Sequence, residues 1–182
     1  MPVISKTKDY NGFAAKVERL QLQDLVDEVA LTMTGFELYV AEKKHANGTR
    51  GIRQSIDSGF ERNGGWKKLT IGGIDWTKQN TLGATIGVEV QVSGRSDMLA
   101  VDIMHLQEKL IAGTIDVGVI VVPDDPLSYY LTDRTPNFRT AVRHVENRAS
   151  HLPIRIWAFG QNGVGDALSK MRTNLGRMGG AE

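Results

Sequence analysis

The feature that most constrains the fold of this chain is a nearly continuous apolar run, IDVGVIVV, over Ile115–Val122. Such a run suits a strand that is buried on both faces, as in the middle of a mixed or parallel sheet. A second strand is predicted over Ile86–Val92, where β-branched residues alternate with others. Between the two, Leu99–Ala112 carries one apolar helical stripe, and Gly113 follows as a terminator. Strand, helix and strand in this order predict a crossover unit of an α/β protein.

The rest of the chain carries weaker signals. Residues 1–12 show no period and predict irregular chain. From Gly12 to Lys44 apolar residues recur mainly at spacings of three and four, which predicts helix with a break at Gly35. Further elements are predicted as a helix over Ile52–Arg62, a strand over Trp66–Ile71, a helix over Asn137–Arg148, a strand over Leu152–Phe159 and a helix over Asp166–Leu175. The expected fold class is therefore α/β, a mixed sheet flanked by helices, with N-terminal helices.

Length and composition narrow the classes of protein. The 182 residues suggest one domain, and 41% hydrophobic residues are enough to build a core, which excludes a disordered chain. There is no cysteine, so disulfides, thiolate metal sites and cysteine nucleophiles are excluded. The N-terminus lacks an apolar secretion signal, and no apolar run approaches the roughly 18 residues of a membrane span. We expect a soluble cytoplasmic protein with no membrane partner.

The formal net charge of +1 hides an uneven distribution of charge. Basic residues dominate residues 43–68 and 134–177, and acidic residues dominate residues 97–133 between them. This pattern is compatible with a nucleic-acid footprint around an acidic centre. From charge alone, a solvated surface with uneven charge is the favoured interpretation.

A candidate site comes from Glu89 and Gln91 in the predicted strand. Side chains two residues apart on a strand point to the same face. If the upstream Asp75 ends a neighbouring strand or turn, its carboxylate can meet that of Glu89. Two converging carboxylates near backbone carbonyls form the oxygen-rich ligand set that Mg²⁺ prefers. On spacing alone the indication is weak, because Glu-x-Gln also occurs on ordinary solvent-facing strands.

The same stretch resembles a known family. The residues Val88-Glu89-Val90-Gln91, then Ala100-Val101-Asp102 and Ile115-Asp116-Val117-Gly118-Val119, are similar to the type II restriction endonucleases of the BglII and BstYI group. These belong to the PD-(D/E)xK nuclease superfamily, in a variant that carries Gln in place of the usual Lys. Phe60 and Gly65-Trp66-Lys67 match an upstream segment of the group. The resemblance covers about residues 52–160, and the chain is shorter than these enzymes.

The resemblance implies a site and a reaction. Asp75, Glu89 and Gln91 fall on the catalytic residues, with Asp75 and Glu89 as the ligands of Mg²⁺. It implies hydrolysis of double-stranded DNA at a short palindrome that leaves 5′-phosphate ends, by a homodimer, beside a DNA methyltransferase that protects the same site. The residues expected to bind DNA are Arg95, Ser96, Arg134 and Arg139.

The implied organisation is a single nuclease domain over residues 1–182. It would consist of a helical N-terminal part over residues 1–50, a catalytic core over residues 52–160 and a glycine-rich basic tail over residues 161–182. The N-terminal helices are candidates for part of a dimer interface.

Three other functions remain open from the residues. A modification-dependent, repair or defence nuclease of the same fold would carry the same site. A DNA-binding domain without catalysis would account for the basic blocks. An unrelated α/β domain would hold Asp75 and Glu89 far apart.

Overall fold

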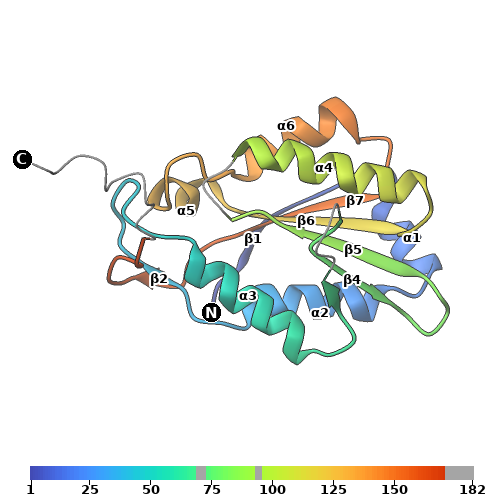
Figure 1. Ribbon diagram of the computed structural model, residues 1–182, viewed down its shortest axis with the longest axis horizontal. Coiled ribbons are helices and arrows are strands. Elements are labelled where there is room, and N and C mark those ends of the chain that lie inside the picture. Colours follow the sequence, from blue (N-terminus) through green and yellow to red (C-terminus); the bar gives the residue numbers. More distant parts are fainter. Residues whose placement is uncertain (69–72, 93–95, 171–182) are drawn as a thin grey trace, which may run out of the picture.

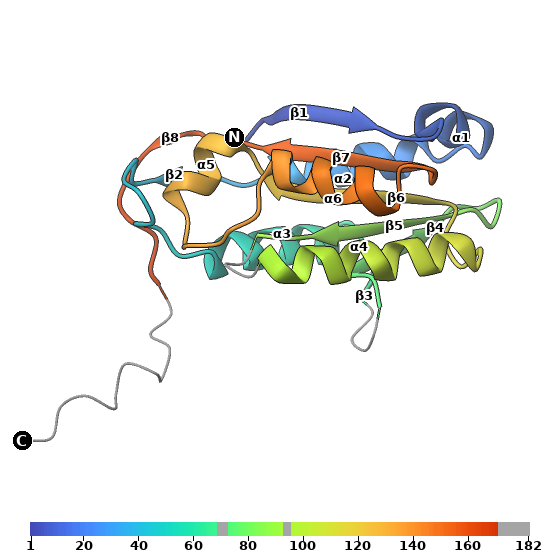
Figure 2. The same cartoon turned by 90° about the horizontal axis from the view of Figure 1, so that it is seen from above.

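The computed structural model describes residues 1–68, 73–92 and 96–170, with the side chain of Ser96 excepted. Within these ranges the main feature is a six-stranded mixed sheet in the order β1-β7-β6-β5-β4-β3. Its three central strands are parallel, and the outer strands are antiparallel to their neighbours. Figure 2 shows β1 and β3 at opposite edges. The strands are β1 (Ile4–Asp9), β3 (Lys67–Lys68), β4 (Trp76–Gln79), β5 (Thr85–Val90), β6 (Val117–Pro123) and β7 (Ile154–Phe159).

Helices cover both faces of this sheet (Figure 1). On one face lie α4 (Ser96–Ile111) and α6 (Phe138–Arg148), and on the other lie α2 (Gln23–Thr34) and α3 (Arg50–Arg62). The shorter α1 (Phe13–Arg19) precedes α2, and α5 (Asp125–Tyr130) follows β6 directly. The two-residue strands β2 (Tyr39–Val40) and β8 (Gly163–Val164) pair with each other apart from the main sheet. The layers confirm the predicted α/β class with a mixed sheet flanked by helices.

The apolar run over Ile115–Val122 supplies the centre of the sheet. Every residue of β6 is buried, as a strand covered on both faces requires. The apolar side chains of the two faces divide into two core clusters. Val119 and Val121 belong to the cluster on the α2 and α3 face, whereas Ile120 and Val122 pack with α4 and α6.

Two glycines in the central strands make room for close packing on the α4 face of the sheet, and one of them faces α4 itself. Gly87 of β5 and Gly118 of β6 are register partners in the parallel ladder. A Cβ atom at Gly118 would lie 2.8 Å from Cδ2 of Leu106, which belongs to α4. At Gly87 it would lie 2.8 Å from Cδ1 of Ile115. The missing side chain of Gly118 therefore sets the distance between α4 and β6, whereas that of Gly87 leaves room for Ile115 and Ile74.

Local signals explain several element ends. Asn137 caps α6, and its side-chain oxygen accepts a hydrogen bond from the Thr140 amide. Asp124 caps α5 in the same way, with Leu127 as the donor. Gly113 follows α4 with a φ of 69°, a conformation that glycine adopts without strain. The predicted helix over Ile52–Arg62 is confirmed as α3.

The structure corrects the prediction for the N-terminal region. Residues 1–12 are not irregular, because β1 joins the edge of the main sheet beside β7. The predicted break at Gly35 is confirmed, because α2 ends there, but no helix follows it within the predicted helical stretch, and an additional break lies at Gln21, with a φ of 53°. Residues 39–40 form β2 in place of helix. The expected N-terminal part over residues 1–50 is therefore mixed in structure and contributes a strand to the main sheet.

Two other predictions extend beyond the described residues. The strand expected over Trp66–Ile71 appears as β3, and residues 69–72 lie outside the described ranges. Asp166–Lys170 is not helical, and the rest of the expected C-terminal helix lies beyond the described part of the chain. No helix among the described residues is long and apolar enough to cross a membrane.

Candidate active site

The sequence-predicted site residues meet at the carboxyl end of β5. Glu89 is the penultimate residue of this strand, and Gln91 follows its last residue. Asp75 directly precedes β4, the antiparallel neighbour of β5. The Oδ2 atom of Asp75 accepts a hydrogen bond of 2.9 Å from the backbone amide of Val90. Asp75 is thereby fixed beside Glu89, and the arrangement expected of an unrelated domain, with the two far apart, is wrong.

Glu89 is held in an unusual environment for a carboxyl group. Its exposed fraction is only 3%, and its Oε1 atom has no hydrogen-bond partner among the described residues. Burial raises the pKa of Glu89 to about 10, and the charges of Asp75 and Asp102 add to the effect. A carboxyl group in this environment either holds a proton or has a positive charge beside it, because an isolated buried carboxylate is very costly.

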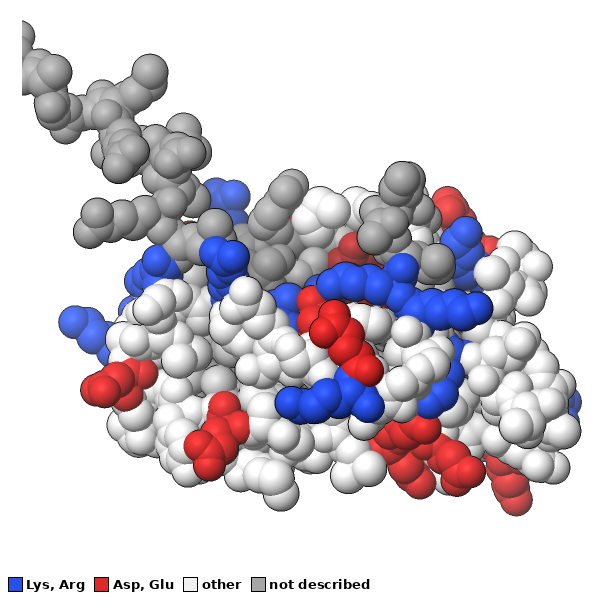
Figure 3. Space-filling view, turned by 60° about the horizontal axis from the view of Figure 1, so that its bottom comes forward, with Lys and Arg blue, Asp and Glu red and all other residues white. Residues whose placement is uncertain are grey.

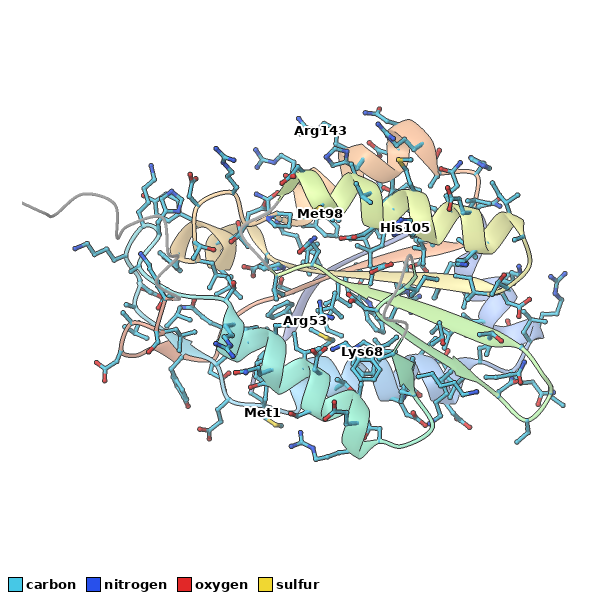
Figure 4. The ribbon with its side chains drawn as sticks, in the orientation of Figure 1. Met1, Arg53, Lys68, Met98, His105 and Arg143 are labelled. Carbon is cyan, nitrogen blue, oxygen red and sulfur yellow. The ribbon has the colours of Figure 1, made fainter. Side chains whose placement is uncertain are left out.

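Arg53 supplies a positive charge on the other side of Asp75. Its Nη2 and Nη1 atoms donate to the two carboxylate oxygens of Asp75 at 2.6 and 3.1 Å. Nη1 also donates to the carbonyl oxygen of Val90 at 2.8 Å. Burial alone would lower the pKa of Arg53, but hydrogen bonds and charges from Asp75 and Asp57 outweigh it and raise the pKa above its ordinary value. Figure 4 shows Arg53 and Lys68 on the α3 side of the site.

Asp57 anchors this guanidinium from α3. It lies four residues after Arg53 on the same helix, and its Oδ1 atom accepts from Nε of Arg53 at 2.9 Å. Asp57 is itself held by Lys68 at 2.8 Å and by the indole Nε1 of Trp76 at 3.1 Å. Arg53 therefore bridges two carboxylates, one from its own helix and one at the start of β4.

Gln91 is oriented from the opposite face, by α4. Its Nε2 atom donates to Oδ2 of Asp102 at 2.7 Å. Burial raises the pKa of Asp102 to about 6, together with the charge of Asp75, against the lowering effect of the Gln91 hydrogen bond. Asp102 is thus a third carboxyl group at the site, brought there by the close approach of α4.

The oxygen atoms of this cluster fit a hard divalent cation. Asp75, Glu89 and the Val90 carbonyl offer oxygen ligands, and an unpartnered buried carboxyl oxygen is among them. In the described residues no group of three or more acidic, histidine or cysteine side chains is arranged to hold a metal alone. Mg²⁺ does not need such a cage, since it is usually bound by one or two carboxylates, with waters and substrate phosphates.

The residues expected to bind DNA fall partly outside the described chain. Arg95 lies in the undescribed segment, and of Ser96 only the backbone, at the start of α4, is described. Arg134 and Arg139 are exposed and lie after α5, which follows β6. Because β6 runs parallel to β5, both arginines follow the carboxyl end of β6, and this is the end of the sheet at which Glu89 lies. Figure 3, with the α2–α3 side turned forward, shows basic side chains gathered beside acidic ones.

Two site residues could not be recognised as such from the sequence. Arg53 was part of a basic block, and only its spacing of four from Asp57 hinted at a pair. Asp102 stood within the stretch that resembles the nuclease family, but a helical aspartate suggests first a local partner. Both act across distances in sequence, 22 residues for Arg53 with Asp75 and 11 for Asp102 with Gln91.

Comparisons with known proteins give a family and a fold for this chain. The model of the restriction endonuclease BglII/BglIII family matches residues 7–161. The chain belongs to this family. Membership makes it a type II site-specific deoxyribonuclease, as the resemblance of the sequence predicted. A search among curated proteins found no match.

Solved structures support the fold. A crystal structure of BglII in complex with a DNA 16-mer is similar with a TM-score of 0.62 and 16% identity, covering 92% of this chain and 79% of that one. Free BglII is similar with a TM-score of 0.54 and 17% identity, covering 92% of this chain and 81% of that one. At such identities the likeness concerns the fold, and it confirms the expected restriction-endonuclease architecture.

Proposed function

We propose that this restriction endonuclease uses Mg²⁺ to hydrolyse double-stranded DNA at a short palindrome, with Asp75, Glu89 and Gln91 as its catalytic residues. The observation that carries the proposal is the buried Oε1 atom of Glu89 without a partner, beside the fixed carboxylate of Asp75. A purely structural site would gain stability by replacing such a group, because its burial is unfavourable. Retaining it there argues for a role in chemistry.

The roles follow from the contacts. Asp75 and Glu89 would hold the Mg²⁺ ion, with the Val90 carbonyl close by. A divalent cation supplies charge that offsets the negative phosphate in the transition state and makes water more acidic. Gln91 would orient the attacking water or a phosphate oxygen, and Asp102 fixes the amide of Gln91 for that task. Cleavage would leave 5′-phosphate and 3′-hydroxyl ends.

Binding of DNA would place the phosphate backbone across the carboxyl ends of β5 and β6. Arg134 and Arg139, and also Arg95 and Ser96, are the residues that we propose for these contacts. One of the similar structures is BglII bound to a DNA 16-mer, which supports duplex DNA as the substrate here. A homodimer would match a palindrome by its two-fold symmetry, and a DNA methyltransferase would protect host DNA in the cytoplasm.

The test is incubation of the purified protein with unmethylated plasmid and phage DNA, with Mg²⁺ or with EDTA. Discrete fragments are expected only with Mg²⁺, and sequencing of their ends gives the site and the end chemistry. A Glu89→Gln variant should produce none. Glu146→Gln, which changes the same chemical group at an exposed position on α6, should cut like the parent.

Other outcomes would select the alternatives. Cutting that requires methylated DNA would identify a modification-dependent nuclease in place of a classical restriction enzyme. Binding that weakens steeply with salt, without any cutting, would indicate a DNA-binding protein and contradict the catalytic proposal.

A further inference from the structure

Arg53 makes contacts that a metal ion would otherwise make. Three hydrogen bonds from its Nη atoms go to the two carboxylate oxygens of Asp75 and to the carbonyl oxygen of Val90. These oxygens lie at the site where the proposed function needs a divalent cation. The guanidinium group is also positively charged and strongly paired, so it offsets the charge of Asp75.

A divalent cation and this guanidinium compete for the same oxygens, since Oδ2 of Asp75 already accepts two hydrogen bonds, one from Arg53 and one from the Val90 amide. Both carry positive charge, and both need the lone pairs of Asp75 and of the Val90 carbonyl. We infer that Arg53 is a resident counter-cation of the active site, which competes with the divalent cation for Asp75 and must leave this carboxylate when the metal ion binds. The inference rests on the proposed function and adds a step that precedes catalysis.

The structure offers Arg53 a way to leave Asp75. Its Nε atom is bound separately to Asp57, on the same helix, at 2.9 Å. Asp57 is held in turn by Lys68 and Trp76. The planar guanidinium moves as one unit, so it can swing away from Asp75 about the hydrogen bond from Nε and keep Asp57 as its partner. The Arg53 side chain is 29% exposed, so its released Nη atoms can reach water or a DNA phosphate.

A second possible role for Arg53 makes the opposite prediction for metal binding. If Arg53 served only to hold Asp75 in a ligating position, its removal would leave Asp75 mobile and weaken metal binding. The two roles predict changes of opposite sign in metal affinity. Affinity measured without DNA therefore decides between them, independently of the rate of cleavage.

The experiment compares the metal affinity of three full-length proteins. Isothermal titration with Mg²⁺ and with Mn²⁺ is run on the parent, on Arg53→Gln and on Arg155→Gln. Arg155 is a matched control, because its guanidinium also pairs with one carboxylate, that of Asp9, by two hydrogen bonds of 2.7 Å. It lies on β7, whose neighbours are β6 and β1, away from the strand that carries Glu89.

We expect Arg53→Gln to bind Mn²⁺ and Mg²⁺ at least about tenfold more tightly than the parent, since charged hydrogen bonds of this strength no longer compete. Its melting temperature without metal should fall, and the rise on adding Mg²⁺ should exceed that of the parent. Arg155→Gln should show a lower melting temperature and an unchanged metal affinity. Arg53→Lys provides a second variant, whose single ammonium should give an intermediate affinity.

Equal or weaker metal binding by Arg53→Gln would overturn the inference. Such a result leaves the proposed function intact if the parent still binds the ion and cuts DNA. Failure of every variant to bind either ion also overturns the inference. The proposed function is then judged separately, by whether cleavage of DNA stops in EDTA.

Discussion

Glu89 and Ile120 occupy partnered positions in the parallel ladder between β5 and β6. Their exposed fractions are 3% and 0%, so both side chains have left water. Ile120 packs in the cluster formed with α4 and α6, where its burial contributes to folding. Glu89 carries a carboxyl group with an orphaned oxygen and a raised pKa. Burial in the same layer of the sheet therefore favours folding at Ile120 and opposes it at Glu89.

This difference separates what the sheet does for folding from what it does for chemistry. The central strands provide a rigid, dry position, and the sequence fills it with a hydrocarbon on β6 and with an acid on β5. A buried acid is tolerated because the rest of the layer is well packed. Substitutions at the two positions should consequently move different observables.

The largest effect should come from Glu89→Gln. We expect cleavage to fall by about a thousandfold or more, the scale seen when one charge-stabilising group is removed from an active site. The free energy of unfolding should stay the same or rise, because a neutral amide is less costly to bury than a carboxyl group. Rates of plasmid cleavage and urea unfolding curves measure the two. A large loss of both would mean that Glu89 has a structural role.

The opposite pattern should follow from Ile120→Ala. Removing this buried side chain should lower the free energy of unfolding by about 2–5 kcal/mol. The cleavage rate per folded molecule should change only a few-fold, since no site group is altered. Urea denaturation and cleavage at 25 °C, with the folded fraction checked by circular dichroism, test the expectation. A loss under about 1 kcal/mol would show that the layer can collapse around the gap.

Two residues earlier on each strand, the glycine pair should give an intermediate effect. Gly118→Ala places a Cβ atom 2.8–3.1 Å from three atoms of Leu106, so α4 has to move or Leu106 has to change rotamer. We expect a loss of about 1–3 kcal/mol by overpacking. Gly51→Ala on α3 is the control, because its Cβ atom would meet nothing within 4 Å, and it should be neutral or stabilising. Equal unfolding curves for the two variants would contradict the close approach.

The smallest effect should be the pH dependence introduced by Asp102. Its pKa in the folded protein is raised to about 6 from the usual 3.8, by burial and by Asp75, with Gln91, His105 and Arg53 opposing. A raised pKa favours the protonated acid in the folded state, so stability is complete below the unfolded pKa and is lost as the pH rises through about 6.

The variant Asp102→Asn should remove that loss. Its stability relative to the parent should increase between pH 4 and pH 7, as followed by thermal unfolding across this range. Cleavage should fall by about tenfold, because the asparagine holds Gln91 less firmly than a charged acceptor does. A parent whose stability does not fall over this interval would contradict the assignment.

The sequence predicted the parts of this molecule that are specified by apolar period. β5, β6, β7, α3, α4 and α6 all follow a clear pattern, and burial of one face or both explains why they were recognised. β1 was missed because its residues, ISKTKD, are mostly polar and exposed. It is a strand because its backbone pairs with the edge of β7, and such pairing leaves no hydrophobic signature.

The site divides in the same way. Glu89 and Gln91 are two residues apart on one strand, so their common face was predictable from the pleat alone. The meeting with Asp75 depended on the pairing of β4 with β5, which the spacing allowed and the resemblance favoured. Arg53 and Asp102 reach the site from helices on opposite faces, and only the packed structure brings them there. The break at Gln21 likewise reflects a left-handed residue that sequence period does not reveal.

The pairing of β1 with β7 has a consequence for the order in which the sheet folds. The half of the sheet that contains Asp75 and Glu89 is built from neighbours in sequence, a hairpin and one crossover, so its contacts close short loops. The strand β1, by contrast, needs a partner about 150 residues later, as the contact of Ser5 with Ala158 across 153 positions illustrates. Contacts at such separation form slowly. β1 must therefore remain unpaired until β7 has been synthesised, and the synthesis of β7 is the event that allows the sheet to be completed.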